Sequence, residues 1–218
     1  MITMELQNMR KLLLIAWLLA AGLCCLAQQE ISLRERGEMI RQVILASEGI
    51  RTVQCEFLQE KKLSLLNECM VSKGKMCFQS PNMLSWEYLS PYVYTFVLNK
   101  QKVLIKSQGK KDVIDVRTSR LFSEIARIMM GSVTGSCLRG DGDFSVEMLK
   151  DKTKWVARLT PKSSGLKRVF SLVTLYINPH EKMVERIEMK EKTGDVTHIT
   201  LSGILINHPL NEKVFAID

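Results

Sequence analysis

Residues from 32 onward show the spacing of an amphipathic helix. In Ser32-Leu33-Arg34-Glu35, a capping box, the Ser32 hydroxyl and the Glu35 carboxylate are expected to satisfy free backbone N–H groups. Apolar residues then recur at helical spacing: Leu33, Ile40, Val43 and Ile44. Polar residues occupy the other side: Arg34, Glu38, Arg41 and Gln42. The pattern predicts a helix that ends near Gly49.

From residue 52 the hydrophobic period changes from about 3.6 residues to about 2. Val53, Cys55 and Phe57 alternate with polar neighbours, as in a strand with one buried face. Further strand-like runs follow, separated by turn residues: Lys75–Gln79, Leu84–Leu89, Tyr92–Leu98, Lys102–Lys106, Val113–Arg117, Phe144–Leu149, Lys154–Leu159, Val169–Ile177, Met183–Lys190 and Val196–Ile206. The short connections predict antiparallel pairing, because parallel strands need a crossover of about a dozen residues or more.

One helical stretch, Thr118–Met130, interrupts the β pattern and ends at Gly131. Its apolar stripe consists of Leu121, Ile125, Ile128 and Met129. No repeat, low-complexity tract or linker divides the chain. We therefore expect a mainly β (α+β) fold, in which one large antiparallel sheet receives the stripes of two amphipathic helices on its concave face.

The first 27 residues have the three parts of a secretory signal peptide. Arg10-Lys11 is the basic part, Leu12–Leu23 carries no charge, and Cys25-Leu26-Ala27 supplies small residues for cleavage. The apolar run is shorter than the roughly 20 residues of a membrane-spanning helix. We expect cleavage after Ala27, export to the periplasm, and a single domain over residues 28–218. Acylation at Cys24 or Cys25 is the alternative, although neither cysteine follows the small residue that acylation requires.

Four cysteines follow the signal segment: Cys55, Cys69, Cys77 and Cys137. Their spacing matches no zinc-binding pattern, and an oxidising compartment permits disulfides. Free buried thiols and one disulfide both remain open.

The net charge is +8 for the whole chain. A positive exterior favours anionic membrane surfaces or acidic partners, and general solubility is the alternative. Nucleic acid is not an expected partner of a secreted protein.

No catalytic or metal-binding motif is evident in the sequence. His180, His198 and His208 lie apart and bring no carboxylates with them, and neither a nucleophile elbow nor a phosphate-binding glycine loop occurs. We expect a binding protein rather than an enzyme, with no cofactor and no metal. Nine of the twelve methionines follow residue 27. Methionine suits surfaces that repack around apolar ligands, although it also fills ordinary cores.

Several short segments occur in a fixed order along the chain. They are Phe57-Leu58-Gln59, Gly74, Phe78, Ser80-Pro81-Asn82, Leu84-Ser85-Trp86-Glu87-Tyr88, Pro91, Leu159-Thr160-Pro161-Lys162, Val169–Ile177, Ile187–Thr200 with Gly194-Asp195 at its turn, and Asn207–Phe215. In this order and spacing, the chain resembles the outer-membrane lipoprotein carrier family, LolA, over essentially all of its mature length.

The resemblance implies a strongly curved antiparallel sheet, or incomplete β-barrel, with helices covering a hydrophobic cavity. It also implies a monomer that carries acylated lipoproteins, or lipids, through the periplasm. The cargo would pass from an inner-membrane ABC-type exporter to an outer-membrane acceptor. Ser80 departs from the family, which commonly has an arginine before this Pro-Asn that helps to hold the lid closed. Serine cannot form charge-assisted bonds of that kind, so either the lid is held differently or the cargo or handover differs.

The expected lipid-binding residues come from both helices and from the sheet. They are Leu33, Ile40, Ile44, Val53, Cys55, Phe57, Trp86, Tyr88, Leu121, Ile125, Ile128 and Met129. The alternative for these residues is a closed, dry core. The alternative function is an envelope lipid-binding or sensor module with a ligand other than a lipoprotein, and a hydrolase without a recognisable motif ranks third.

Overall fold

The structure is a computed structural model that describes residues 31–66, 68–115, 128, 130–131, 135–139 and 142–217. The chain divides into two compact units, Met1–Ile31 and Ser32–Asp218. Ile31 is the one described residue of the first unit, so the helices and strands below all belong to the second. The predicted signal peptide lies outside the described residues, as do Leu121, Ile125 and Met129.

Helix α2 (Leu33–Glu48) confirms the first predicted helix. The Ser32 hydroxyl accepts a hydrogen bond from the Glu35 amide over 3.1 Å. The Glu35 carboxylate pairs with Lys150 on strand β7 (Phe144–Asp151). Gly49 caps the C-terminal end.

The buried stripe of α2 differs from the predicted one. Met39 and Val43 are the buried residues of the helix, Ile40 and Ile44 are half-buried, and Leu33 is 85% exposed. The helix packs against β7 and against the 3₁₀ helix η1 (Ser136–Arg139). A Cβ built on Gly135, just before η1, would lie 2.5 Å from Val43 Cγ1. This close approach turns the Met39 and Val43 side of the helix inward.

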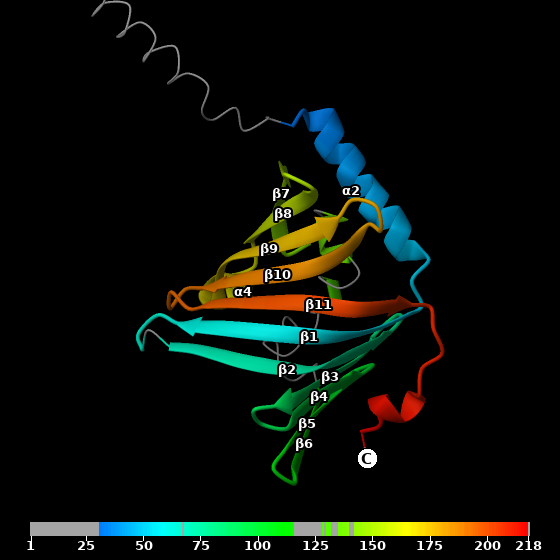
Figure 1. Cartoon of the computed structure of the whole chain (residues 1–218), viewed down its shortest axis with the longest axis vertical. Coiled ribbons are helices and arrows are strands. Elements are labelled where there is room, and N and C mark those ends of the chain that lie inside the picture. The colour runs from blue at the N-terminus through cyan, green and yellow to red at the C-terminus, as the bar shows by residue number, and fades with distance from the viewer. Residues whose placement is uncertain are drawn as a thin grey trace, which may run out of the picture. The chain divides into compact units, whose positions relative to one another are not determined.

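Eleven antiparallel strands form one open sheet (Figure 1). The strands are β1 (Thr52–Leu63), β2 (Glu68–Gln79), β3 (Met83–Ser90), β4 (Tyr94–Asn99), β5 (Lys102–Ser107), β6 (Lys110–Asp115), β7, β8 (Lys154–Pro161), β9 (Phe170–Asn178), β10 (Met183–Glu191) and β11 (Val196–Ile206). Their spatial order is β6-β5-β4-β3-β2-β1-β11-β10-β9-β8-β7. Strands β6 and β7 remain as edges, so the sheet is an incomplete barrel, and the predicted fold class is confirmed.

Each predicted strand run corresponds to a strand, but several bounds differ, and β4 begins at Tyr94 rather than at Tyr92. Strand β2 begins at Glu68, seven residues before the predicted start, and β6 (Lys110–Asp115) begins three residues before the predicted Val113, while residues 116–117 of that predicted run lie outside the described residues. A short helix, α4 (Ser164–Val169), precedes β9, and it was not predicted. The Ser163 hydroxyl caps this helix by accepting a hydrogen bond from the Leu166 amide.

The sheet is apolar on both faces in its β4–β5 region. The C-terminal 3₁₀ helix η2 (Glu212–Phe215) brings Phe215 against Val97 and Leu104, and we call these three residues the outer cluster. The Asn99 amide nitrogen donates a 3.0 Å hydrogen bond to the Phe215 carbonyl. The outer cluster therefore fastens the end of the chain to one face and leaves the other face to different partners.

Among the described residues, no helix combines the length and apolar character that crossing a bilayer requires.

Candidate functional site

The sheet face opposite the outer cluster is a continuous apolar surface, which we call the apolar face. Strand register brings its residues into rows that cross β1, β2, β3 and β4. The rows are Val53, Phe78, Leu84 and Leu98; Cys55, Met76, Trp86 and Phe96; and Phe57, Gly74, Tyr88 and Tyr94. Because side chains alternate along a strand, residues two apart share this face.

A second row extends the apolar face through the other half of the sheet. It crosses β11, β10, β9, β8 and β7 with Ile199, Ile187, Leu175, Ala157 and Met148. All five residues are buried. Leu201 on β11 lies opposite Phe57 on β1 and joins the two halves.

Aromatic rings fill the centre of the first half. Phe57 stacks on Trp86 with ring centroids 4.4 Å apart, and it meets Tyr88 edge-on at 5.1 Å. Tyr88 in turn lies 5.8 Å from Tyr94. Offset and edge-on pairs of this kind stabilise aromatic clusters beyond the area that they bury.

Two polar atoms lie within this aromatic cluster. The Tyr88 hydroxyl donates a 2.9 Å hydrogen bond to the Gln59 side-chain oxygen. Burial raises the pKa of Tyr88 and also that of Tyr94. Trp86 Nε1 is buried and forms no hydrogen bond of full geometry with a described residue, although it lies close enough to the Tyr88 hydroxyl to lower the pKa of that group. The apolar face therefore offers one indole N–H to a hydrogen-bond acceptor.

The predicted site residues divide into three groups. Val53, Cys55, Phe57 and Trp86 are buried, and they come together with half-buried Tyr88 on the apolar face. The helix residues have different surroundings: Ile128 is buried, Ile40 and Ile44 are half-buried on α2, and Leu33 is exposed. Leu121, Ile125 and Met129 lie outside the described residues.

The sequence reasoning missed residues that share the apolar face with the predicted ones. Met76, Phe96 and Leu98 lie in the same rows, and the whole second row was overlooked. All of them lie in predicted strands, so extending the alternation along each strand would have found them.

The chemistry of the apolar face suits binding more than bond breaking. Burial raises the pKa of Cys55 to about 12, so its thiol stays protonated near neutral pH and is a poor nucleophile. The four described cysteines are free in this structure. Within the described part of the chain, no three His, Cys, Asp or Glu side chains are placed to hold a metal ion.

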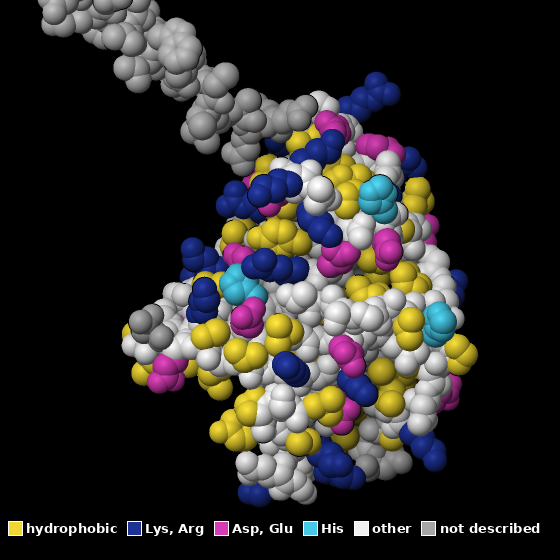
Figure 2. All heavy atoms as spheres, viewed as in Figure 1, with side chains coloured by type: hydrophobic (Ala, Val, Ile, Leu, Met, Phe, Trp, Pro, Cys, Tyr) yellow, Lys and Arg dark blue, Asp and Glu magenta, His cyan; other side chains and the backbone are white. Residues whose placement is uncertain are grey.

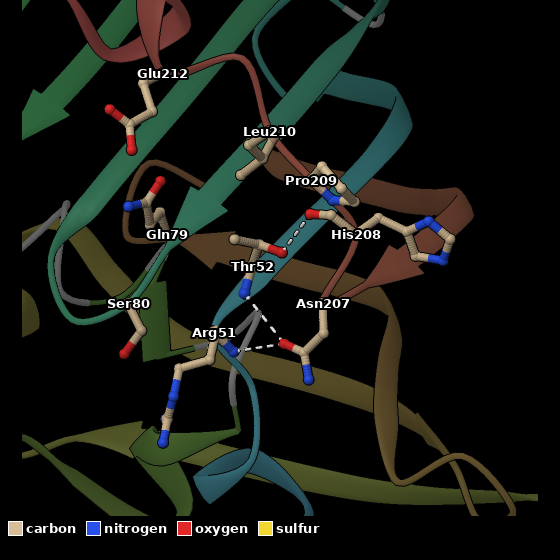
Figure 3. A pocket seen from close by; sticks show the side chains of 9 residues that line it. All are labelled: Arg51, Thr52, Gln79, Ser80, Asn207, His208, Pro209, Leu210 and Glu212. Atoms are coloured by element: carbon tan, nitrogen blue, oxygen red, sulfur yellow. Dashed lines mark hydrogen bonds between the residues drawn. The ribbon is translucent and has the colours of Figure 1, made fainter.

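A groove of about 620 Å³ lies at the end of the sheet where α2 leads into β1 (Figure 3). Asn207 organises it: its side-chain oxygen accepts hydrogen bonds from the Arg51 amide at 2.7 Å and the Thr52 amide at 3.3 Å. Arg51 and Ser80 both line the groove, and the Ser80 amide donates to the Arg51 carbonyl over 2.8 Å. The residue that departs from the family pattern, Ser80, thus lies beside an arginine of the neighbouring segment.

Solved structures with similar folds include three bacterial proteins. A LolA superfamily protein from Nitrosomonas europaea is 12% identical, with a TM-score of 0.45, over 81% of this chain and 97% of its own. Lipoprotein LppX from Mycobacterium tuberculosis is 14% identical, with a TM-score of 0.46, over 86% of this chain and 100% of its own. LprF from Mycobacterium bovis is 13% identical, with a TM-score of 0.46, over 82% of this chain and 95% of its own.

No curated protein matches the chain at a significant level. The sequence model described as outer membrane lipoprotein carrier protein LolA matches residues 48–218. This match covers all eleven strands and so spans the whole apolar face. On this evidence, the chain belongs to the LolA family.

Proposed function

We propose that this protein is a periplasmic carrier that binds the acyl chains of lipoproteins on its apolar face and moves them from the inner to the outer membrane. One observation carries the proposal: a shielded apolar face runs across the strands of an open sheet in a member of the LolA family. The protein binds and releases its cargo and catalyses no reaction.

The energetics of acyl burial support this function. Each buried methylene contributes about 0.8 kcal/mol, so a chain of about fourteen methylenes is held by roughly 11 kcal/mol without a covalent bond. Trp86 Nε1–H is available to an ester or amide carbonyl at the head of such a chain. Release then requires an acceptor that offers an apolar environment at least as good.

The protein and its cargo follow one path through the cell envelope. The signal peptide, residues 1–27, is cleaved after export, and residues 28–218 act as a single monomeric domain. An inner-membrane ABC-type exporter loads the cargo, and an outer-membrane acceptor receives it. The lining includes Val53, Cys55, Phe57, Trp86, Tyr88, Ile128 and the half-buried side of α2, with Leu121, Ile125 and Met129 from the second predicted helix. Leu33 is left out because its side chain is exposed.

The test is mass spectrometry of what copurifies with the protein after expression in a bacterial periplasm. We expect lipoprotein, or acylated fragments of it, in roughly stoichiometric amounts. A ligand-free protein would contradict the proposal, and free lipid without protein would assign the apolar face to a different ligand.

Two neighbours on β4 provide a matched pair of variants. Phe96 belongs to the apolar face and Val97 to the outer cluster, and both are buried. Phe96→Ala should reduce copurified cargo several-fold, whereas Val97→Ala should leave it unchanged. Thermal unfolding of both variants shows whether each is still folded.

A further inference from the structure

Exposed apolar side chains gather at one end of the sheet. Eleven large hydrophobic residues of the described chain are exposed. Seven of them lie on the β1–β2 hairpin, at the end of β3 or on the β3–β4 loop: Leu65, Leu66, Met70, Val71, Leu89, Tyr92 and Val93. Leu65 is 91% exposed and Tyr92 is 71% exposed. Isolated surface leucines need no explanation, but a group of this size marks an interaction surface.

The register of the sheet places both loops at the same end. Ser90, the last residue of β3, lies opposite Lys73 on β2, and the β1–β2 turn lies before Glu68, at the start of β2 and farther out in the same direction. The turns between β5 and β6 and between β10 and β11 open at this end too. We call this group of turns, with the seven exposed residues, the loop end. In Figures 1 and 2 the β1–β2 hairpin projects on the left and carries hydrophobic side chains.

Polar contacts hold the most prominent tip in place. The Ser64 amide donates to Asp195 Oδ1 over 2.9 Å, and the Ser64 hydroxyl donates to the Thr193 carbonyl over 3.0 Å. Lys61 pairs with Glu191 at 2.8 Å across the same two hairpins. Leu65 and Leu66 therefore follow a segment that is hydrogen-bonded to the β10–β11 hairpin, and both side chains face solvent.

Basic residues surround the apolar tips. Exposed lysines of the loop end are Lys62, Lys73, Lys106, Lys110, Lys111, Lys190 and Lys192. The exposed acidic residues there are Glu60, Glu68 and Asp112, fewer than the exposed lysines, and Glu191 and Asp195 are engaged by Lys61. Apolar tips with lysines set behind them match the interface of an anionic bilayer, where leucine enters the acyl boundary and lysine stays among the headgroups.

We propose that the loop end docks the protein on an anionic lipid bilayer, with Leu65 and Leu66 as the inserting residues. This contact goes beyond the proposed carrier function, because it needs no cargo. The loop end is then the surface with which the carrier contacts the membrane.

The test is cosedimentation of the periplasmically expressed protein with two kinds of vesicle. We expect binding to vesicles of phosphatidylethanolamine and phosphatidylglycerol, much weaker binding to phosphatidylcholine vesicles, and loss of binding at high salt. The double variant Leu65→Ser with Leu66→Ser should bind the anionic vesicles at least about tenfold more weakly, because two apolar anchors are removed. Leu205→Ser is the control, since Leu205 is exposed on β11 near the opposite end of the sheet.

A second measurement reports the contact directly. With Leu65→Trp, added anionic vesicles should shift the tryptophan emission to shorter wavelength, and Leu205→Trp should show no such shift. The proposal would be overturned if the wild-type protein did not bind the anionic vesicles, or if the double variant bound them as well as the wild type does. Self-association that disappears in the double variant, without vesicle binding, would overturn it too and assign the loop end to a second copy of the chain. Copurification of cargo with the double variant tests the carrier function separately. Cargo that is retained while vesicle binding is lost shows that the two functions are independent.

Discussion

The ring of Phe57 lies over the backbone of Gly74, its directly paired neighbour on β2. A Cβ on Gly74 would be 2.5 Å from Phe57 Cζ and 1.9 Å from the carbonyl oxygen of Glu87 on β3. Both separations are shorter than real Cβ contacts. Phe57 thus occupies the space that a side chain at position 74 would need, and there its ring reaches Trp86.

Gly74→Ala should therefore destabilise the protein strongly. One of the colliding atoms belongs to the backbone of β3, so the strands themselves must move, and we expect the free energy of unfolding to fall by about 3 kcal/mol. Urea denaturation measures the change. The control is Gly37→Ala on α2, where no atom lies within 4 Å of the new Cβ, and it should raise stability by about 0.5–1 kcal/mol. Equal stability of Gly74→Ala and wild type would contradict the geometry.

Thiol reactivity tests how well the apolar face is shielded. Burial raises the pKa of Cys55 and of Cys137 to about 12, whereas Cys69 is exposed on the β1–β2 hairpin. Iodoacetamide at about pH 8 should modify Cys69 in the native protein, and Cys55 and Cys137 only after unfolding, because the thiolate is the reactive form. Peptide mass spectrometry reports each site. Native Cys55 that reacts as fast as Cys69 would show that solvent reaches the face.

Tyr88 should make the protein sensitive to alkali. Burial raises its pKa above the value of about 10 that tyrosine has in an unfolded chain. The folded state then holds the proton more tightly than the unfolded chain does. The resulting contribution to the free energy of unfolding is complete below about pH 10 and is lost as the pH rises through the raised pKa. Tyr88→Phe should flatten that decline. It should also cost about 1 kcal/mol near neutral pH, because the Gln59 side-chain oxygen loses its donor.

Denaturation at a series of alkaline pH values measures both effects of Tyr88→Phe. Tyr92→Phe is the matched control, because Tyr92 is largely exposed. An alkaline transition that is the same in Tyr88→Phe and wild type would refute the assignment to Tyr88.

Asp195 should control the order of the β1–β2 tip. A hydrogen bond from the Ser64 amide is the main cause that lowers the pKa of the Asp195 carboxyl. The ionised form is therefore present well below neutral pH, and its contribution is lost only as the pH falls through that lowered value. Asp195→Ala should speed hydrogen exchange at the Ser64 amide, whereas Asp112→Ala on edge strand β6 should not. Unchanged protection at Ser64 would mean that other contacts hold the tip.

The alternation of apolar and polar residues predicted the strands. It could not predict where a distant segment also covers the second face of the sheet. On β4 and β5, Val97 and Leu104 interrupt the polar face and are covered by Phe215, more than a hundred residues further along the chain. Continuous apolar runs such as Phe96-Val97-Leu98 are typical of strands buried on both faces, so the sequence contained that signal. The identity of the covering segment depends on tertiary contacts alone.

The local sequence pattern also gave the wrong buried side where contacts with other segments set the orientation of an element. On α2 the predicted stripe and the buried one share Val43, yet Met39 is buried and Leu33 is exposed, because the approach of Gly135 determines which side faces inward. The first part of β2, from Glu68 to Val71, is exposed. It shows no alternation, because neither of its sides is buried.

Photo-crosslinking shows whether acyl chains lie on the apolar face. The protein is loaded with a lipopeptide whose acyl chain carries a diazirine, then irradiated, and the labelled residues are identified by peptide mass spectrometry. We expect labels on Phe57, Trp86 and Phe96, and none on Val97 or Leu104 of the outer cluster. Labels confined to the outer cluster or to the loop end, or no specific label at all, would contradict binding of acyl chains on the apolar face.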